Sequence, residues 1–109
     1  MEKIINIDGR DIRLKSNAAL LLRYKMQFGK DALGAIMKMD EATKSDGIID
    51  ADKLDTEVFY NLLWVMAKTA EPGIAPPLEW FGEFESIPFN ETVQTISELL
   101  QACLQTKKK

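Results

Sequence analysis

The sequence predicts an α+β fold that is mostly helical, with an N-terminal β-hairpin followed by four or five helices. Two observations lead to this prediction. Short alternating apolar runs flank an Asp-Gly pair near the start, and later apolar residues recur at helical spacing. Strands followed by helices are typical of the α+β class. At 109 residues the chain has the length of one domain, residues 1–109.

The hairpin is predicted over residues 1–15. Two isoleucines spaced two apart precede Asp8 and Gly9, and Ile12 and Leu14 follow with the same spacing. Asp-Gly between alternating runs favours a two-residue turn, because glycine accepts the positive φ that such turns require. Since an isolated hairpin is only marginally stable in water, its apolar face is expected to rest on the helices.

Two helices are predicted over residues 16–39. Ser16 or Asn17 is expected to cap the first, and Gly29 to follow its end. Asp31 suits the positively polarised start of a shorter second helix. The first apolar stripe is expected to contain Ala18, Leu21, Leu22, Lys25 and Phe28, widened by Leu20, Tyr24 and Met26, and the second helix to align Leu33, Ile36 and Met37.

Residues 40–54 are polar and are predicted to form a loop, and residues 55–69 a central helix capped by Asp55 or Thr56. This helix is apolar over most of its circumference, which indicates a position in the middle of the domain. Its stripe is expected to contain Val58, Phe59, Leu62, Leu63 and Met66, with Trp64 and Val65 beside or opposite it.

Residues 77–105 are predicted to form the C-terminal helices, and residues 106–109 a basic tail. Pro77 suits the first position of a short helix that reaches Phe84, and the last helix is expected to start at Asn90. The last helix repeats apolar residues in a heptad-like pattern, too short to indicate a coiled coil. This seam contains Phe89, Val93, Ile96, Leu100 and Cys103.

Charge is distributed unevenly along the chain. Residues 1–30 hold seven Lys/Arg and three Asp/Glu, whereas residues 31–106 hold four and fourteen. One interpretation is that the two regions form separate charged faces that water solvates. The other is that they steer complementary surfaces together, including those of two copies of the chain. The acidic bulk argues against nucleic acid as a partner. No apolar run approaches the about 20 residues that a membrane helix needs, so no membrane contact is expected.

No catalytic, cofactor or metal site is predicted, and the chain is not expected to be an enzyme. It has no histidine and one cysteine, which fits a reducing cytosol. A calcium loop starting at Asp46 would place Glu57 at position 12, but Ile48 and Ala51 would occupy positions 3 and 6. Cys103 lies on the apolar seam and is expected to be an inert packing residue.

Partner binding is predicted at three aromatic residues, Trp80, Phe81 and Phe84. Aromatic side chains dominate both protein cores and interface hot spots, so packing beneath the central helix remains an open alternative. Met37 and Met39 are predicted to add an adaptable apolar surface, since methionine repacks readily.

The order of these elements resembles the tail assembly chaperones of long-tailed phages and prophages of Gram-positive bacteria. The similarity covers nearly the whole chain and consists of the order and spacing of apolar and aromatic positions. It is carried by Ile12, Arg13 and Leu14 in the strand pair, by Ser16, Asn17, Ala18 and Ala19 opening a helix, and by residues 24–31 (YKMQFGKD), 60–68 (YNLLWVMAK) and 78–81 (LEWF).

The resemblance implies a non-enzymatic protein of the host cytoplasm that binds the tape measure protein, and also tail tube subunits, and is absent from the finished virion. It further implies a longer form made by programmed frameshifting, for which the lysine codons of residues 107–109 would supply the slippery sequence. Two alternatives stay open. One is a head–tail connector or minor tail protein of the virion, and the other is a small bacterial regulatory or antitoxin-like module.

Overall fold

A computed structural model describes residues 1–34, 36–37 and 56–104. Within them a two-stranded antiparallel hairpin precedes the helices, which confirms the predicted α+β class. Residues 33–34 and 36–37 are helical as well. The elements are β1 (Glu2–Ile7), β2 (Arg10–Lys15), α1 (Leu20–Phe28), α3 (Thr56–Ala70), α4 (Pro77–Phe81) and α5 (Phe89–Leu104).

Several predictions concern residues outside the described ranges. These are the polar loop at 40–54 with its calcium test at Asp46, the methionine Met39, and the basic tail at 106–109.

The hairpin turns at the predicted Asp-Gly pair. Asp8 and Gly9 both have positive φ, 57° and 83°, as a two-residue type I′ turn requires. This turn places Ile5 opposite Ile12 in the antiparallel register. The Asp8 carboxylate also accepts a hydrogen bond from the backbone N–H of Glu85 over 3.1 Å, so the turn is joined to the segment that follows α4.

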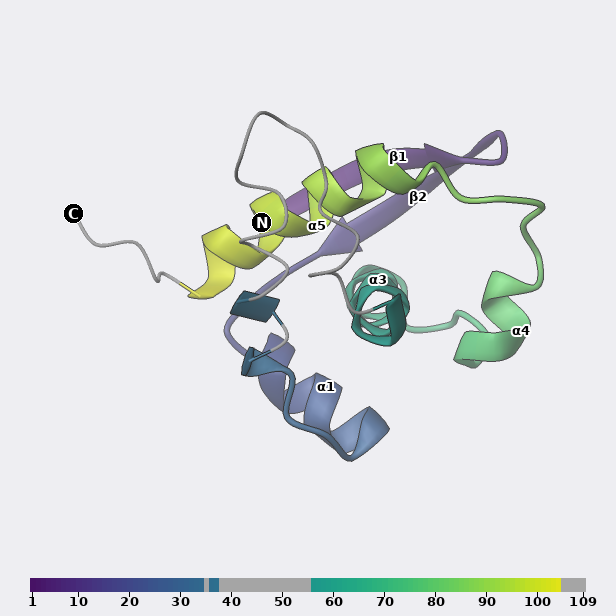
Figure 1. The fold of residues 1–109 in the computed structure, drawn as a ribbon. Coiled ribbons are helices and arrows are strands. Elements are labelled where there is room, and N and C mark those ends of the chain that lie inside the picture. Colours follow the sequence, from purple (N-terminus) through teal and green to yellow (C-terminus); the bar gives the residue numbers. More distant parts are fainter. Residues whose placement is uncertain (35, 38–55, 105–109) are drawn as a thin grey trace.

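One face of the hairpin rests on helices, as its apolar pattern predicts. Ile5 and Ile7 of β1 and Ile12 and Leu14 of β2 are buried, while the opposite face of both strands is exposed. Helix α3 packs against β2 and α5 against β1. Figure 1 shows α3 between the hairpin and α1, with α4 to one side of it.

Helix α3 is the central helix that the sequence predicts. Eight of its residues are buried, and they lie on nearly every side of the helix because it contacts the hairpin, α1 and α5 together. Trp64 and Val65 are as inaccessible to solvent as the residues of the predicted stripe. The buried residues are Val58, Phe59, Leu62, Leu63, Trp64, Val65, Met66 and Ala67.

Helix α1 starts later than predicted, and neither expected residue caps it. The helix begins at Leu20 after Ala19. Asn17 Oδ1 accepts the backbone N–H of Ala19 over 3.0 Å in the preceding turn. Ser16 is buried at the end of the hairpin, where its backbone N–H donates to the Met1 carbonyl over 2.9 Å and its carbonyl accepts from the Met1 amino group over 3.0 Å, so it belongs to the hairpin and does not cap α1. Gly29 does end the helix as predicted, at a φ of 74°.

The apolar stripe of α1 is narrower than predicted. Leu20 and Tyr24 are buried, whereas Leu22 and Met26 are exposed. The register is set by Tyr24, whose hydroxyl accepts a hydrogen bond of 3.1 Å from the amide of Asn61 on α3. This contact fixes which side of α1 faces α3. Leu22 and Met26, two positions before and after Tyr24, therefore lie on a different side of the helix.

The short helical stretch after α1 buries only part of its predicted face. Asp31 Oδ1 accepts the backbone N–H of Leu33 over 3.3 Å, as a residue at a helix start does. Ile36 and Ala32 are buried, but Leu33 and Met37 are exposed. The predicted apolar alignment of these three residues is therefore wrong for two of them.

Helix α5 keeps most of its predicted seam but differs at its start. Val93, Ile96 and Leu100 are buried as predicted, and Leu99 joins them. Phe89 is exposed instead, although its ring lies 5.0 Å from that of Phe59. A straight helix repeats every 3.6 residues rather than every 3.5, so a heptad seam drifts around it.

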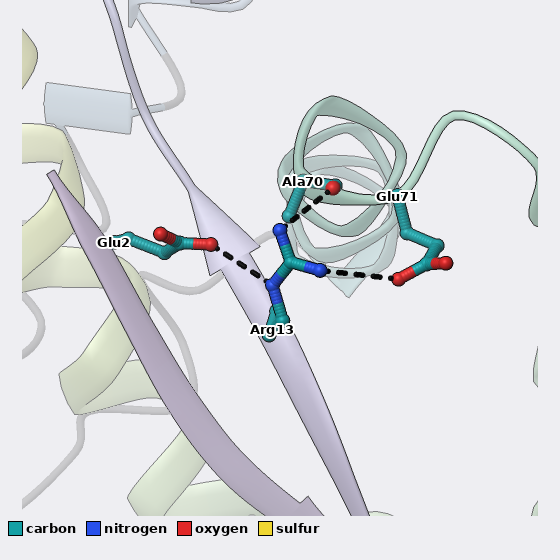
Figure 2. Close-up of polar contacts among 4 residues, drawn as sticks. All are labelled: Glu2, Arg13, Ala70 and Glu71. Atoms are coloured by element: carbon teal, nitrogen blue, oxygen red, sulfur yellow. Dashed lines mark hydrogen bonds and ion pairs between the residues drawn. The ribbon is translucent and has the colours of Figure 1, made fainter.

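Some of the unevenly distributed charges form ion pairs with one another within the described residues. Arg13 illustrates this (Figure 2), since its guanidinium reaches Glu2 and Glu71 and also donates to the carbonyl of Ala70 at the end of α3 over 3.1 Å. All these groups are partly exposed, so each pair contributes little stability. Four pairs join a base of the first 30 residues to a later acid: Lys3–Glu98, Arg10–Glu83, Arg13–Glu71 and Lys30–Glu57.

Candidate functional site

The segment after α3 folds back along that helix and positions α4. Trp64 Nε1 donates a hydrogen bond of 2.9 Å to the carbonyl oxygen of Ala75, and Lys68 Nζ donates one of 2.7 Å to that of Pro72. Helix α4 then begins with Pro77, whose fixed φ suits the first helical position. The returning segment is thus held to α3 at two points before α4 starts.

The structure separates the three aromatic residues that the sequence singles out. Trp80 is only 2% exposed, and its ring lies 5.0 Å from Phe81 and 5.1 Å from Phe84. Phe84 is buried too, with the Arg10 guanidinium 4.8 Å from its ring centre. Trp80 and Phe84 therefore belong to the core. Phe81 is half-buried and keeps part of its ring at the surface.

Phe81 lines an open hollow that we call the α4 groove. Its volume is about 470 Å³, and its lining is mainly apolar. Leu78 is 87% exposed and Tyr60 44% exposed, and the Tyr60 and Phe81 rings meet edge to face at 5.0 Å. The lining includes Tyr60, Leu78, Phe81, Phe84, Glu85 and Ile87. An apolar ligand surface could replace water here at a favourable free energy.

Of the two methionines of the predicted surface, Met37 lies in the described part of the chain. Met37 is exposed but is not among the residues that line the α4 groove. Met39 falls outside the described residues. Among the described residues of the predicted set, Phe81 and Phe84 line the α4 groove.

A second hollow, which we call the α1–α3 groove, was not predicted. Its volume is about 490 Å³, and Leu22 and Met26 lie in its wall with exposed fractions of 62% and 78%. The sequence contained a signal for it. The predicted stripe of α1 was wider than one packing face, so some of its apolar residues had to lie outside the core.

Two observations on the described residues concern metal binding and their one cysteine, Cys103. Among residues 1–34, 36–37 and 56–104, no three His, Cys, Asp or Glu side chains gather closely enough to hold a metal ion. Burial raises the pKa of the Cys103 thiol above its ordinary value of 9.0. A raised pKa reduces the thiolate fraction at neutral pH, and therefore its nucleophilicity.

No protein-family model, curated protein or solved structure matches this chain. In the described ranges, no helix has both the length and the apolar character to cross a membrane. Both the α4 groove and the α1–α3 groove have mainly apolar linings.

Proposed function

We propose that this chain is a tail assembly chaperone of a long-tailed phage or prophage. It binds the tape measure protein in the host cytoplasm, performs no catalysis, and leaves before the virion is complete. The resemblance of its apolar and aromatic positions to that family supports the proposal. The exposed apolar surface around α4 supports it independently, because a chaperone must cover apolar segments of its client.

The observation that carries the proposal is the α4 groove. Leu78 extends almost fully into solvent, beside the half-buried ring of Phe81 and the partly exposed ring of Tyr60. The buried ring of Trp80 lies 5.0 Å from that of Phe81 and supports it from within. A mainly apolar groove of this kind can accept side chains spaced three and four residues apart on a client helix.

Co-expression tests the proposal directly. The tagged chain is produced together with the long helix-rich protein encoded just downstream in its genome. We expect a soluble complex, with the long protein aggregating when it is produced alone. The Leu78→Glu variant should fold normally and lose the complex, because a carboxylate would be placed within the apolar contact.

Ile4 provides a matched control for that variant. It is a branched aliphatic residue, 62% exposed, on the uncovered face of the hairpin. Ile4→Glu should therefore leave the complex intact. Equal binding by wild type and Leu78→Glu would contradict the assignment of the groove. A downstream protein that is soluble unaided, together with detection of this chain in purified virions, would instead favour a structural tail protein.

A further inference from the structure

The α1–α3 groove combines an apolar wall with a basic rim. Leu22 and Met26 lie one helical turn apart on α1, and Trp64 and Val65 of α3 form the base of the groove. Arg23 reaches the rim from α1, and Lys68 from α3. No acidic residue lines the groove in the described part of the chain.

The two rim cations are available to a ligand in different ways. Lys68 donates to the Pro72 carbonyl and lies 5.7 Å from the ring centre of Trp64, so its position is fixed at the end of α3. Arg23 is exposed and forms no ion pair with the described residues. By contrast, Arg10 and Arg13 are both paired with later carboxylates.

Two internal contacts join the helices that form the groove. The hydrogen bond from Asn61 to the Tyr24 hydroxyl joins α1 to α3, and Phe28 meets Trp64 edge to face at 6.1 Å. These contacts lie on the buried side of α1, so they fix its distance from α3 without covering Met26. A preformed groove binds without the entropic cost of ordering its walls.

We propose that the α1–α3 groove binds an amphipathic helix of another protein, one with apolar residues at i and i+4 flanked by carboxylates. Leu22 and Met26 present apolar side chains at the same one-turn spacing, which suits helix-to-helix packing. Cations on both helices that form the groove select for acidic flanks on the ligand. This site is separate from the α4 groove, so it does not depend on the proposed chaperone function.

Two synthetic helical peptides with the same apolar positions test the inference. One carries glutamates at all flanking positions, and the other carries lysines. At low salt we expect the glutamate peptide to bind the full chain about tenfold more tightly than the lysine peptide, because two rim cations attract one peptide and repel the other. Isothermal titration calorimetry measures both dissociation constants.

Charge reversal locates the binding. Arg23→Glu, at an exposed position without an ion pair to the described residues, should weaken binding of the glutamate peptide and strengthen binding of the lysine peptide. Met26→Glu should weaken binding of both peptides. Leu78→Glu in the α4 groove should change neither, which distinguishes this site from the proposed chaperone surface. Circular dichroism checks that each variant is folded.

Three outcomes would overturn the inference. The first is equal affinity for the two peptides, or no binding of either one. The second is a loss of peptide binding in Leu78→Glu, which would place the site in the α4 groove. The third is self-association of the chain, seen by light scattering and abolished by Arg23→Glu, which would make the groove an interface between copies of the chain.

Discussion

The indole of Trp64 donates its N–H to the carbonyl oxygen of Ala75 across 2.9 Å. The same side chain meets Phe28 of α1 and forms part of the base of the α1–α3 groove. Ala75 belongs to the segment that leads directly into α4. One buried residue therefore connects the helix that carries one groove with the segment that positions the other.

Replacing Trp64 with phenylalanine should loosen this connection. The variant loses the donor, which leaves the Ala75 carbonyl without its partner, and it also loses part of a buried ring, so the two changes together should lower the unfolding free energy by about 2–3 kcal/mol. Urea unfolding followed by circular dichroism measures the loss. Hydrogen exchange should also show faster exchange at residues 74–81 than in the wild type. An unchanged unfolding midpoint would mean that the hydrogen bond contributes nothing to the fold.

Trp80 and Phe81 should respond differently to alanine. Trp80→Ala removes a fully buried ring and should lower stability by about 3–5 kcal/mol, a large part of the roughly 5–15 kcal/mol of a typical domain. Phe81→Ala removes a half-buried ring and should cost about 1–2 kcal/mol, while it weakens binding of the tape measure protein. Denaturation and co-purification of both variants test this contrast. Equal destabilisation would place Phe81 in the core together with Trp80.

Gly29→Ala should destabilise the end of α1. Gly29 has a φ of 74° and donates its N–H to the Lys25 carbonyl over 2.7 Å. No atom lies near the added Cβ, so the cost is conformational, about 1 kcal/mol. Gly34→Ala is the control, because Gly34 is helical and its added Cβ is also unobstructed. Thermal unfolding should therefore show a loss for the first variant and none for the second.

The Cys103 thiol should make stability depend on alkaline pH. Burial raises its pKa above 9.0 in the folded chain, so the unfolded chain releases this proton first as the pH rises. The contribution of the thiol to stability is then fully present below pH 9 and decreases above it. Urea unfolding between pH 8 and pH 10 measures the decrease. Cys103→Ser should remove that part of the slope, and an identical slope in the variant would contradict the assignment.

Native Cys103 should also react slowly with iodoacetamide. Its Sγ lies 3.6 Å from the Leu100 carbonyl oxygen, and its thiol is half-buried at the end of α5. We expect alkylation at pH 8 to be several-fold slower in the folded chain than in concentrated urea, because less thiolate is present and access is restricted. Equal rates would show that the folded structure does not protect the thiol.

Local chemistry made much of the fold predictable. The Asp8 and Gly9 turn, the positive φ of Gly29, and the start of α4 at Pro77 each follow from the conformations that one or two residues prefer. The largely apolar circumference of residues 55–69 likewise predicted a central helix, because a helix that is apolar over most of its surface must be covered over most of it.

The sequence did not indicate which apolar residues would remain outside the hydrophobic core. Leu22 and Leu20 have the same side chain, yet Leu22 is exposed and Leu20 is buried, because contacts such as that of Tyr24 with Asn61 set which side of α1 faces α3. Trp80 and Phe81 are neighbours in a short helix, yet the Trp80 ring is buried in the hydrophobic core and the Phe81 ring lies at the α4 groove.

The sequence by itself therefore determined the class of fold, the order of its elements and several of their ends, because turns, caps and helical periodicity depend on residues close together in the chain. Only the tertiary structure decided the two grooves and the pairing of the N-terminal bases with later acids. Those features depend on how α1, α3 and α4 lie against one another. That arrangement is set by contacts such as Trp64 with Ala75 and Tyr24 with Asn61, which join different elements of the fold.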